Sequence, residues 1–404
     1  MADIVGPAAP GRRIRFAVAA MVLSALIACA RSGPPEATGP PGTAVPGMDT
    51  AQLARFAEGE ALLNHEFTPE EGLGPLFNQR RCSSCHDLPT PGGMGEEPIV
   101  RVTVFTPPAT CDLLTDAGGE NIQMRATPLL EAALGVLGEE VPRDRGASVA
   151  PVVPPALYGL GLIEAIPEAT LLANADPDDA NGDGISGRAG KTAQGGVGRF
   201  GRKAEFATLA AFIDGAARAE LGLTTPAHPH EETLNGVPVP PETDPAPDPE
   251  LTDAQLGVLT DYVRHLAAPE REDVPAAARD TVARGERVFS RLGCAACHVP
   301  AMRTAADAAP PLANRTVRLY SDLLLHDLGE ESASACGIGA LPGEWRTASL
   351  MGLRLRHKYM YDGRAGGVGI AIELHGGEAT AARNGWFLLD EADRNALFRF
   401  LLTL

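Results

Sequence analysis

Apolar residues recur at helical spacing in five segments of the chain. The pattern predicts helices over residues 50–63, 208–221, 251–267, 280–292 and 390–404. Thr252 and Asp390 stand where an N-cap is expected, and the acidic residues after Asp390 suit the positive end of a helix dipole. Strict alternation of apolar and polar residues is scarce. The pattern therefore predicts a mainly α-helical protein with long loops.

The same short motif occurs twice. Residues 82–86 and 294–298 both read Cys-x-x-Cys-His. Phe77 lies five residues before Cys82, and Phe289 lies five residues before Cys294. This spacing indicates an internal repeat of one small helical module.

Composition limits the class of protein. The chain has 404 residues, of which 44% are hydrophobic and 21% charged, enough for two or three packed domains. Asp and Glu outnumber Lys and Arg by 52 to 34, and the formal charge is −18. Binding to nucleic-acid phosphates requires the opposite sign, so we expect no nucleic-acid partner.

The first 28 residues have the pattern of an export signal. Three arginines precede an apolar run over residues 16–28 that is too short for a comfortable membrane span. The run ends at Cys29 in a sequence that resembles the bacterial lipobox, so we expect a lipoprotein anchored to the membrane through lipidated Cys29. An ordinary secretory signal with a chance cysteine is the alternative. Either signal places the chain on the periplasmic side of a bacterial membrane, where disulfides form.

Cleavage of the signal would make the net charge of the mature chain more negative. Loss of one Asp and three Arg with residues 1–28 changes the formal charge to −20. Residues 29–48, which are rich in Gly, Pro and Ala, predict a flexible tether.

Both Cys-x-x-Cys-His motifs match the sequence to which c-type haem is attached. The two thiols form thioethers with the haem vinyl groups, and the following His ligates the iron. A thioredoxin-type dithiol or half of a zinc site is the alternative for either pair alone. Two copies in an exported chain favour two covalently bound c-type haems. The attaching thiols would be those of Cys82, Cys85, Cys294 and Cys297, and the proximal iron ligands would be His86 and His298.

Further segments resemble one known family. They lie at residues 155–167, 181–188, 198–204, 344–347, 362–365 and 374–379. Together with the two motifs, they make the mature chain similar to bacterial di-haem c-type oxidoreductases, a thiol-oxidoreductase-like group of peroxidases related to the di-haem cytochrome c peroxidases. The resemblance implies two cytochrome c-like haem domains, over residues 49–150 and 273–404. A loop-rich, partly helical insert over residues 151–272 would separate them.

The resemblance also implies a second ligand for the C-terminal haem. In the related peroxidases, that ligand follows an aromatic-His-Asp-Gly stretch by about fourteen residues. The matching stretch here contains Tyr361 in place of His, and the same interval leads to His375. We expect His375 to be the distal ligand; Met351, His357 and Met360 are rivals, and a hydrogen-bonding role in a loop is the alternative.

No distal ligand stands out for the N-terminal haem, so an open position for a small oxidant is expected there. Cleavage of a peroxide bond also needs an acid or base and a polarising group. Gln123, Arg125 and Glu164 are candidates by residue type and by their position between the motifs. Arg125 could instead pair with a haem propionate, and Glu164 could be an ordinary helix residue.

An acidic turn at residues 179–185 resembles the first half of a calcium loop. Asp179, Asn181 and Asp183 offer oxygen ligands at alternate positions, but Gly190 stands where an EF-hand has its bidentate Glu. We expect either a calcium site that is not an EF-hand or a solvated turn held by side-chain-to-backbone bonds. Cys111 and Cys336 remain unassigned, and either a disulfide between them or two separate buried thiols would explain them.

These observations predict an exported di-haem oxidoreductase of the peroxidase type. A small redox protein or another donor would reduce the C-terminal haem, and the N-terminal haem would reduce a small oxidant such as hydrogen peroxide. An electron-transfer cytochrome with both irons fully ligated is the main alternative. Thiol chemistry at Cys111 and Cys336 has little support, since neither lies in a Cys-x-x-Cys sequence.

Overall fold

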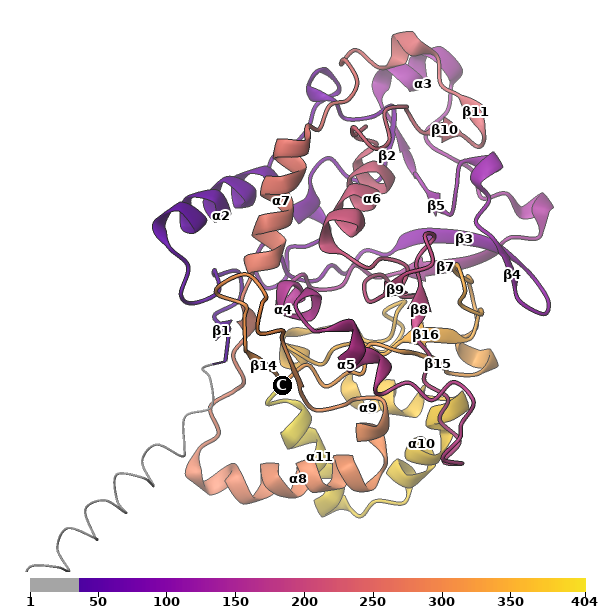
Figure 1. Ribbon diagram of the computed structural model, residues 1–404. Coiled ribbons are helices and arrows are strands. Elements are labelled where there is room, and N and C mark those ends of the chain that lie inside the picture. Colours follow the sequence, from indigo (N-terminus) through magenta and orange to yellow (C-terminus); the bar gives the residue numbers. More distant parts are fainter. Residues whose placement is uncertain (1–35) are drawn as a thin grey trace, which may run out of the picture. The chain divides into compact units, whose positions relative to one another are not determined.

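Helices form the framework around both motifs. The computed structural model describes residues 36–404, so the expected signal and Cys29 lie outside the described residues. Ten α-helices occur in this part (Figure 1): α2 (Thr50–Leu63), α3 (Pro128–Leu134), α4 (Leu160–Glu164), α5 (Glu168–Leu172), α6 (Leu209–Leu221), α7 (Asp253–His265), α8 (Arg279–Arg291), α9 (Val368–Glu373), α10 (Thr380–Phe387) and α11 (Glu391–Leu401). All five helices predicted from periodicity are confirmed, as α2, α6, α7, α8 and α11. None of the helices between residues 36 and 404 is both long and apolar enough to span a bilayer.

Side-chain caps explain where these helices begin. The side chains of Thr208, Thr252 and Asp390 accept backbone N–H groups in the first turns of α6, α7 and α11. Such a cap satisfies a donor that the helix itself leaves unpaired, and it contributes about 1 kcal/mol.

The largest sheet is built around β3 (Ile99–Thr106). It pairs antiparallel with β4 (Thr110–Asp112), β5 (Asn121–Ile122) and β7 (Ser148–Val152). The other strands form two-stranded ladders: β1 (Thr38–Gly39) with β12 (Ala268–Pro269), β2 (Leu76–Phe77) with β6 (Arg125–Ala126), β8 (Gly190–Lys191) with β9 (Val197–Gly198), β10 (Thr233–Leu234) with β11 (Val237–Pro238), β13 (Met302–Arg303) with β14 (Thr316–Val317), and β15 (Leu325–Asp327) with β16 (Glu344–Arg346).

The expectation of a mainly α-helical protein made of two cytochrome c-like domains is wrong. The fold is mixed α/β, with 34% of residues in helices and 15% in strands. Most strands have only two or three residues, so an alternation of apolar and polar residues cannot be recognised in them. β3 is long enough, and its alternating Val100, Val102 and Val104 were a signal that could have been recognised.

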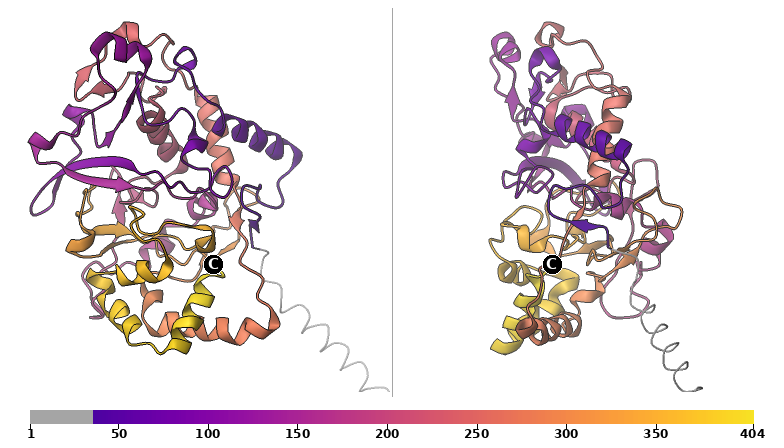
Figure 2. Two further views of the ribbon diagram at one scale, coloured as in Figure 1. Left: turned by 180° about the vertical axis from the view of Figure 1, so that it is seen from behind. Right: turned by 90° about the vertical axis from the view of Figure 1, so that its left-hand side faces the viewer.

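Two helix pairs pack tightly, one near each motif. α2 lies against α7, and α8 lies against α11. Gly59 in α2 leaves no room for a Cβ, which would lie 2.5 Å from Tyr262 Cβ, and a Cβ at Gly285 in α8 would lie 2.0 Å from Ala396 O. The glycines therefore permit the close crossing of each pair. Figure 2 shows α8, α10 and α11 gathered at one end of the described part.

Residues 37–48, the described part of the tether expected over residues 29–48, pack against other segments of the described chain. β1 pairs in parallel with β12, and the side chains of Ala37 and Val45 are each only 2% exposed. The partner strand lies about 230 residues away in sequence, so local composition gave no sign of this contact.

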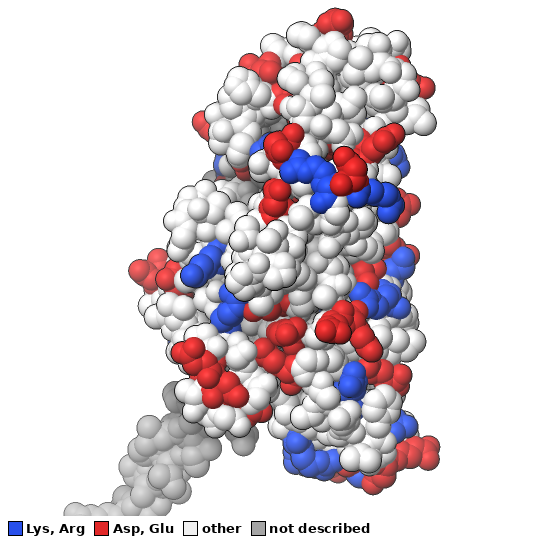
Figure 3. Space-filling view, turned by 90° about the vertical axis from the view of Figure 1, so that its right-hand side faces the viewer, with Lys and Arg blue, Asp and Glu red and all other residues white. Residues whose placement is uncertain are grey.

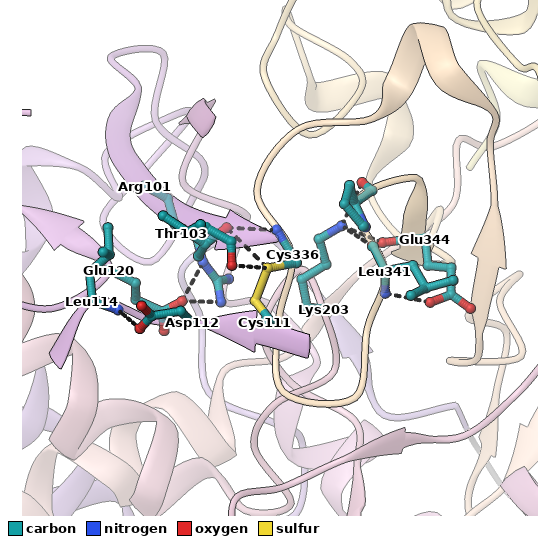
Figure 4. Close-up of a disulfide and its surroundings, with 12 residues drawn as sticks. Arg101, Thr103, Cys111, Asp112, Leu114, Glu120, Lys203, Cys336, Leu341 and Glu344 are labelled. Atoms are coloured by element: carbon teal, nitrogen blue, oxygen red, sulfur yellow. Dashed lines mark hydrogen bonds and ion pairs between the residues drawn. A yellow bond between two sulfur atoms is a disulfide. The ribbon is translucent and has the colours of Figure 1, made fainter. Parts of the chain in front are cut away.

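A disulfide joins Cys111 in β4 to Cys336 (Figure 4). The Cys336 N–H also donates to Thr103 Oγ1 of β3 at 2.9 Å. Of the two explanations left open for these cysteines, the structure supports the disulfide. It ties residues of the second half of the chain to the sheet of the first half.

Candidate functional site

Two cavities of nearly equal volume lie at the two Cys-x-x-Cys-His motifs. The N-terminal cavity has a volume of about 550 Å³ and is lined by Cys82, Cys85 and His86. The C-terminal cavity has a volume of about 530 Å³ and is lined by Cys294, Cys297 and His298. Both volumes are within the range of sites for drug-sized ligands and cofactors.

Each motif folds into one 3₁₀ turn followed by the histidine. The turns span Cys82–Ser84 and Cys294–Ala296, and the N–H groups of His86 and His298 donate to the carbonyls of the first cysteines. One short turn therefore directs two thiols and an imidazole toward the same cavity.

None of the four thiols of the motifs forms a disulfide. Burial raises the pKa of Cys82 to about 11, that of Cys85 to about 12 and that of Cys294 to about 11. Burial therefore favours the neutral form of these three thiols.

The histidines of both motifs line the cavities, and each has a backbone carbonyl beside its Nδ1. His86 Nδ1 lies 3.2 Å from the carbonyl oxygen of Gly93, and His298 Nδ1 lies 2.8 Å from that of Tyr320. A carbonyl only accepts, so Nδ1 of His298 carries the proton and its Nε2 keeps a lone pair, whereas the His86 ring also has the Pro155 carbonyl as a second acceptor. Burial lowers the pKa of His86, and it lowers that of His298 to about 4. Both rings are therefore neutral at pH 7, as ligands must be.

A second imidazole faces His298 across the C-terminal cavity. The ring centres of His298 and His375 lie 6.5 Å apart. His375 Nδ1 lies 2.6 Å from the carbonyl oxygen of Ala371, which again leaves Nε2 as the free nitrogen. Burial lowers the pKa of His375, so it too is neutral. The residues of this cavity thus fit an iron held between two imidazoles.

Two of the three rival ligands also line the C-terminal cavity. Met351 and Met360 line the C-terminal cavity, whereas His357 is exposed and is not part of its lining. In the described residues, no aromatic or histidine ring is paired with His86 as His375 is with His298. Met94, nine residues after Cys85, lines the C-terminal cavity and is not part of the lining of the N-terminal cavity. The two motifs therefore differ in what lies opposite the proximal histidine.

The comparison with known proteins agrees with this donor set. Residues 152–404, well over half of the chain, match the family described as "Di-haem oxidoreductase, putative peroxidase". The chain belongs to this di-haem oxidoreductase family. The second motif lies inside the matched residues, and the first lies before them.

Two solved structures are also similar to this di-haem oxidoreductase at low identity. Hydrazine synthase from Kuenenia stuttgartiensis has 14% identity over 61% of this chain and 87% of its own, with a TM-score of 0.29. A MauG-like protein associated with microbial copper homeostasis has 13% identity over 92% of this chain and 93% of its own, with a TM-score of 0.42. No curated protein sequence matches the chain.

The three predicted catalytic side chains are not brought together in the oxidoreductase. Gln123 lines the N-terminal cavity, but its amide donates to the carbonyls of Arg218 and Ala219. Arg125 is exposed, and Glu164 forms an ion pair with Arg264. Neither Arg125 nor Glu164 belongs to the described lining of either cavity. The chain interval between the motifs was too coarse a guide to position.

Glu220 is a residue of the N-terminal cavity that sequence reasoning missed. Its Oε2 accepts a hydrogen bond from the Asn78 amide at 3.0 Å, and no Lys or Arg pairs with it among the described residues. Burial raises the pKa of Glu220 to about 7, against a partial lowering by Asn78. A carboxyl with this pKa can donate or accept a proton at neutral pH. Nothing in the sequence of α6 marks Glu220, since its burial comes from distant segments.

His326 is a second missed residue, at the C-terminal cavity. Its Nε2 lies 2.8 Å from Asp322 Oδ2, and its Nδ1 lies 2.7 Å from Glu378 Oε2. Burial opposes its charged form, but hydrogen bonds with Asp322, Cys297 and Glu378 raise the pKa of His326 to about 12. Asp322 and Glu378 therefore favour the charged form of His326, whose Nδ1 lies 3.5 Å from Cys297 Sγ.

The predicted calcium ligands lie in an exposed turn. Asp179 accepts the N–H of Gly184, Asn181 accepts that of Asp183, and Asp183 accepts that of Ile185. These are the side-chain-to-backbone bonds of the alternative explanation, a solvated acidic turn. Asp183 also lines the C-terminal cavity.

Proposed function

We propose that this di-haem oxidoreductase is a c-type peroxidase. Each haem would be attached through the two thiols of its motif. A donor would deliver electrons at the C-terminal cavity, and a small oxidant would be reduced at the N-terminal cavity. With hydrogen peroxide, two electrons and two protons yield two waters.

The asymmetry of the two cavities carries this proposal. His298 has an imidazole partner at 6.5 Å, in His375, whereas His86 has none among the described residues. Haem iron supplies one-electron redox chemistry, and a position for a small oxidant where one axial site is open. His298 and His375 would both hold the iron of the C-terminal haem. His86 would hold that of the N-terminal haem.

Glu220 is the residue we propose to handle protons. Other carboxyls of the N-terminal cavity are engaged with cations: Glu120 and Glu205 pair with Arg101, and Glu232 pairs with Arg218. Glu220 is held only by the Asn78 amide and has a pKa of about 7. It can release a proton to bound oxidant and be reprotonated from water at neutral pH.

The proposed donor would dock near the C-terminal cavity. α9 and α10 contribute lining residues, and three large apolar side chains on or beside them are exposed: Ile370 by 50%, Phe387 by 54% and Leu388 by 87%. Apolar side chains at a surface commonly mark an interaction site. On the face drawn in Figure 3, acidic and basic side chains are interspersed, so charge on that face does not select the sign of a partner.

Spin state and turnover distinguish the peroxidase from an electron carrier. We expect a high-spin, five-coordinate haem in the half-reduced protein and reaction of that form with peroxide. Two low-spin haems in every oxidation state, with no reaction, would make the protein a carrier.

Export, lipidation and calcium form a second part of the proposal. The signal pattern at residues 1–28 supports a periplasmic lipoprotein anchored through Cys29. Mass spectrometry of the mature N-terminus tests it, since an unmodified cysteine would refute lipidation. The oxygens of Asp179, Asn181 and Asp183 support a calcium site. Recovery of activity by Ca²⁺ but not Mg²⁺ after chelation tests it, and activity that survives chelation would refute it.

A further inference from the structure

One wall separates the two cavities and belongs to both. Its shared lining consists of Pro154, Pro155, Gly201, Arg202, Phe212 and Arg346. The two arginines lie side by side, because the N–H of Arg346 donates to the carbonyl of Arg202 at 3.0 Å. Arg356 lines the C-terminal cavity alone. Three guanidinium groups thus face the space that the cofactors would occupy.

These arginines lack anionic partners within the described protein. Arg202 donates to the Val153 carbonyl, and its Nε is buried without a partner. Arg346 donates to the carbonyls of Gly201 and Thr347. No carboxylate among residues 36–404 forms an ion pair with either of them.

Arg356 also has only carbonyl partners. Arg356 donates to the carbonyls of Ser349 and Met351, and no described carboxylate pairs with it. Burial, reinforced by the charges of Arg346 and Arg356, lowers the pKa of Arg202 to about 9. Arg101 in the N-terminal cavity shows the contrast, since Glu120 and Glu205 both bind it.

Neighbouring buried cations are unfavourable unless an anion joins them. Glu205 and Asp322 act on the charge of Arg346, and Asp362 acts on that of Arg202, but none of these carboxylates forms an ion pair with them. The paired anion would therefore come from a ligand. A haem carries two propionate carboxylates, and a guanidinium can bind a carboxylate through two parallel hydrogen bonds. We propose that Arg202 and Arg346 bind propionates of both haems at the shared wall, and that Arg356 binds a propionate of the C-terminal haem alone. The inference rests on haem occupying both cavities, not on peroxidase turnover.

A cation held at the shared wall would affect both redox centres. Reduction adds one negative charge to each haem, and a buried positive charge nearby stabilises the reduced form with little screening. Loss of Arg202 should lower the midpoint potential of both haems. Loss of Arg356 should lower that of the C-terminal haem alone.

Spectroelectrochemical titration of the full-length holoprotein tests this assignment. The variants are Arg202→Gln, Arg356→Gln and, as a control at an exposed position, Arg143→Gln. For R202Q we expect both reduced-to-oxidised ratios at fixed potential to fall by about tenfold, equal to 59 mV for a one-electron couple. Resonance Raman bands of the propionates should shift in R202Q and R356Q but not in R143Q.

Haem content, measured first, separates the two possible failures. A wild-type protein without two haems would overturn the proposed function itself. Two haems in R202Q with unchanged potentials, or with a shift of one haem only, would overturn the inference. If R202Q does not retain both haems, R356Q decides: a lower midpoint potential of the C-terminal haem alone supports the inference, and unchanged potentials of both haems overturn it.

Discussion

Replacing His375 by Ala tests the arrangement of the C-terminal cavity. The ring centres of His298 and His375 lie 6.5 Å apart. Two metal–imidazole bonds of about 2 Å, with roughly 1 Å from each nitrogen to its ring centre, require about 6 Å. The observed separation therefore suits one iron between the two Nε2 atoms. Loss of the His375 ring in H375A should change one of the two haems from low spin to high spin.

The backbone around His375 should tolerate this change. The N–H of His375 bonds to the Ile372 carbonyl at the end of α9, and this bond does not depend on the side chain. Optical absorption and electron paramagnetic resonance of the ferric protein measure the spin state. H357A, which removes an exposed histidine outside the cavity lining, is the matched control and should leave the spectrum as in wild type.

A methionine at position 375 sharpens the same test. Histidine–methionine ligation raises the potential of a haem relative to two histidines. H375M should therefore remain low spin and have a higher midpoint potential at one haem. A low-spin spectrum that does not change in H375A would refute the assignment. Met351 or Met360, which line the same cavity, would then be the next ligands to test.

Three further changes have defined outcomes. The pKa of Glu220 is about 7, so peroxide turnover should fall as the pH rises through 7 and the carboxyl loses its proton. E220Q should lose this pH dependence and most of its activity. A wild-type pH profile in E220Q would exclude Glu220 as the acid. Glu164 accepts hydrogen bonds from Arg264 and from the Leu209 N–H at the start of α6, so E164Q should lower the free energy of unfolding by about 1–2 kcal/mol. Spectra and turnover should be unchanged, and a change in haem potential would contradict this structural role. Replacing both Cys111 and Cys336 by Ser should cost about 2–5 kcal/mol of unfolding free energy in denaturant titrations, because the disulfide closes a loop of 225 residues; equal stability in the two proteins would show that the bond adds nothing.

The sequence predicted what depends on neighbours along the chain. Helices such as α7 and α11 have local caps and periodicity, and both lie within two or three residues of their expected ends. The 3₁₀ turns that direct the thiols are also local. The strands were missed because β1 and β12 are short and become a ladder only through a contact between remote segments. Composition alone therefore gave the wrong fold class.

The candidate site divides in the same way. The proximal ligands follow from the motifs, and His375 follows from a family resemblance. Glu220 and His326 could not be recognised, because their properties come from burial and from partners such as Asn78 and Asp322 that the fold supplies. Spacing along the chain placed Gln123 at the N-terminal cavity, but it gave no information on the direction of a side chain.

The repeat that the sequence shows most clearly is also where the two halves differ most in chemistry. Each motif provides the same thiols and the same proximal imidazole, so the proximal side cannot distinguish an oxidant site from an electron-entry site. The distinction comes from segments outside the repeat. The end of α9 brings His375 opposite His298, whereas α6 brings Glu220 to the cavity of His86. On the proposed function, His375 would take the position that an oxidant needs in one cavity, and Glu220, with a pKa of about 7, would supply the proton in the other. The proposed division of work therefore depends on the second imidazole of the C-terminal cavity, and removing it should make the spin state of that haem the same as that of the other.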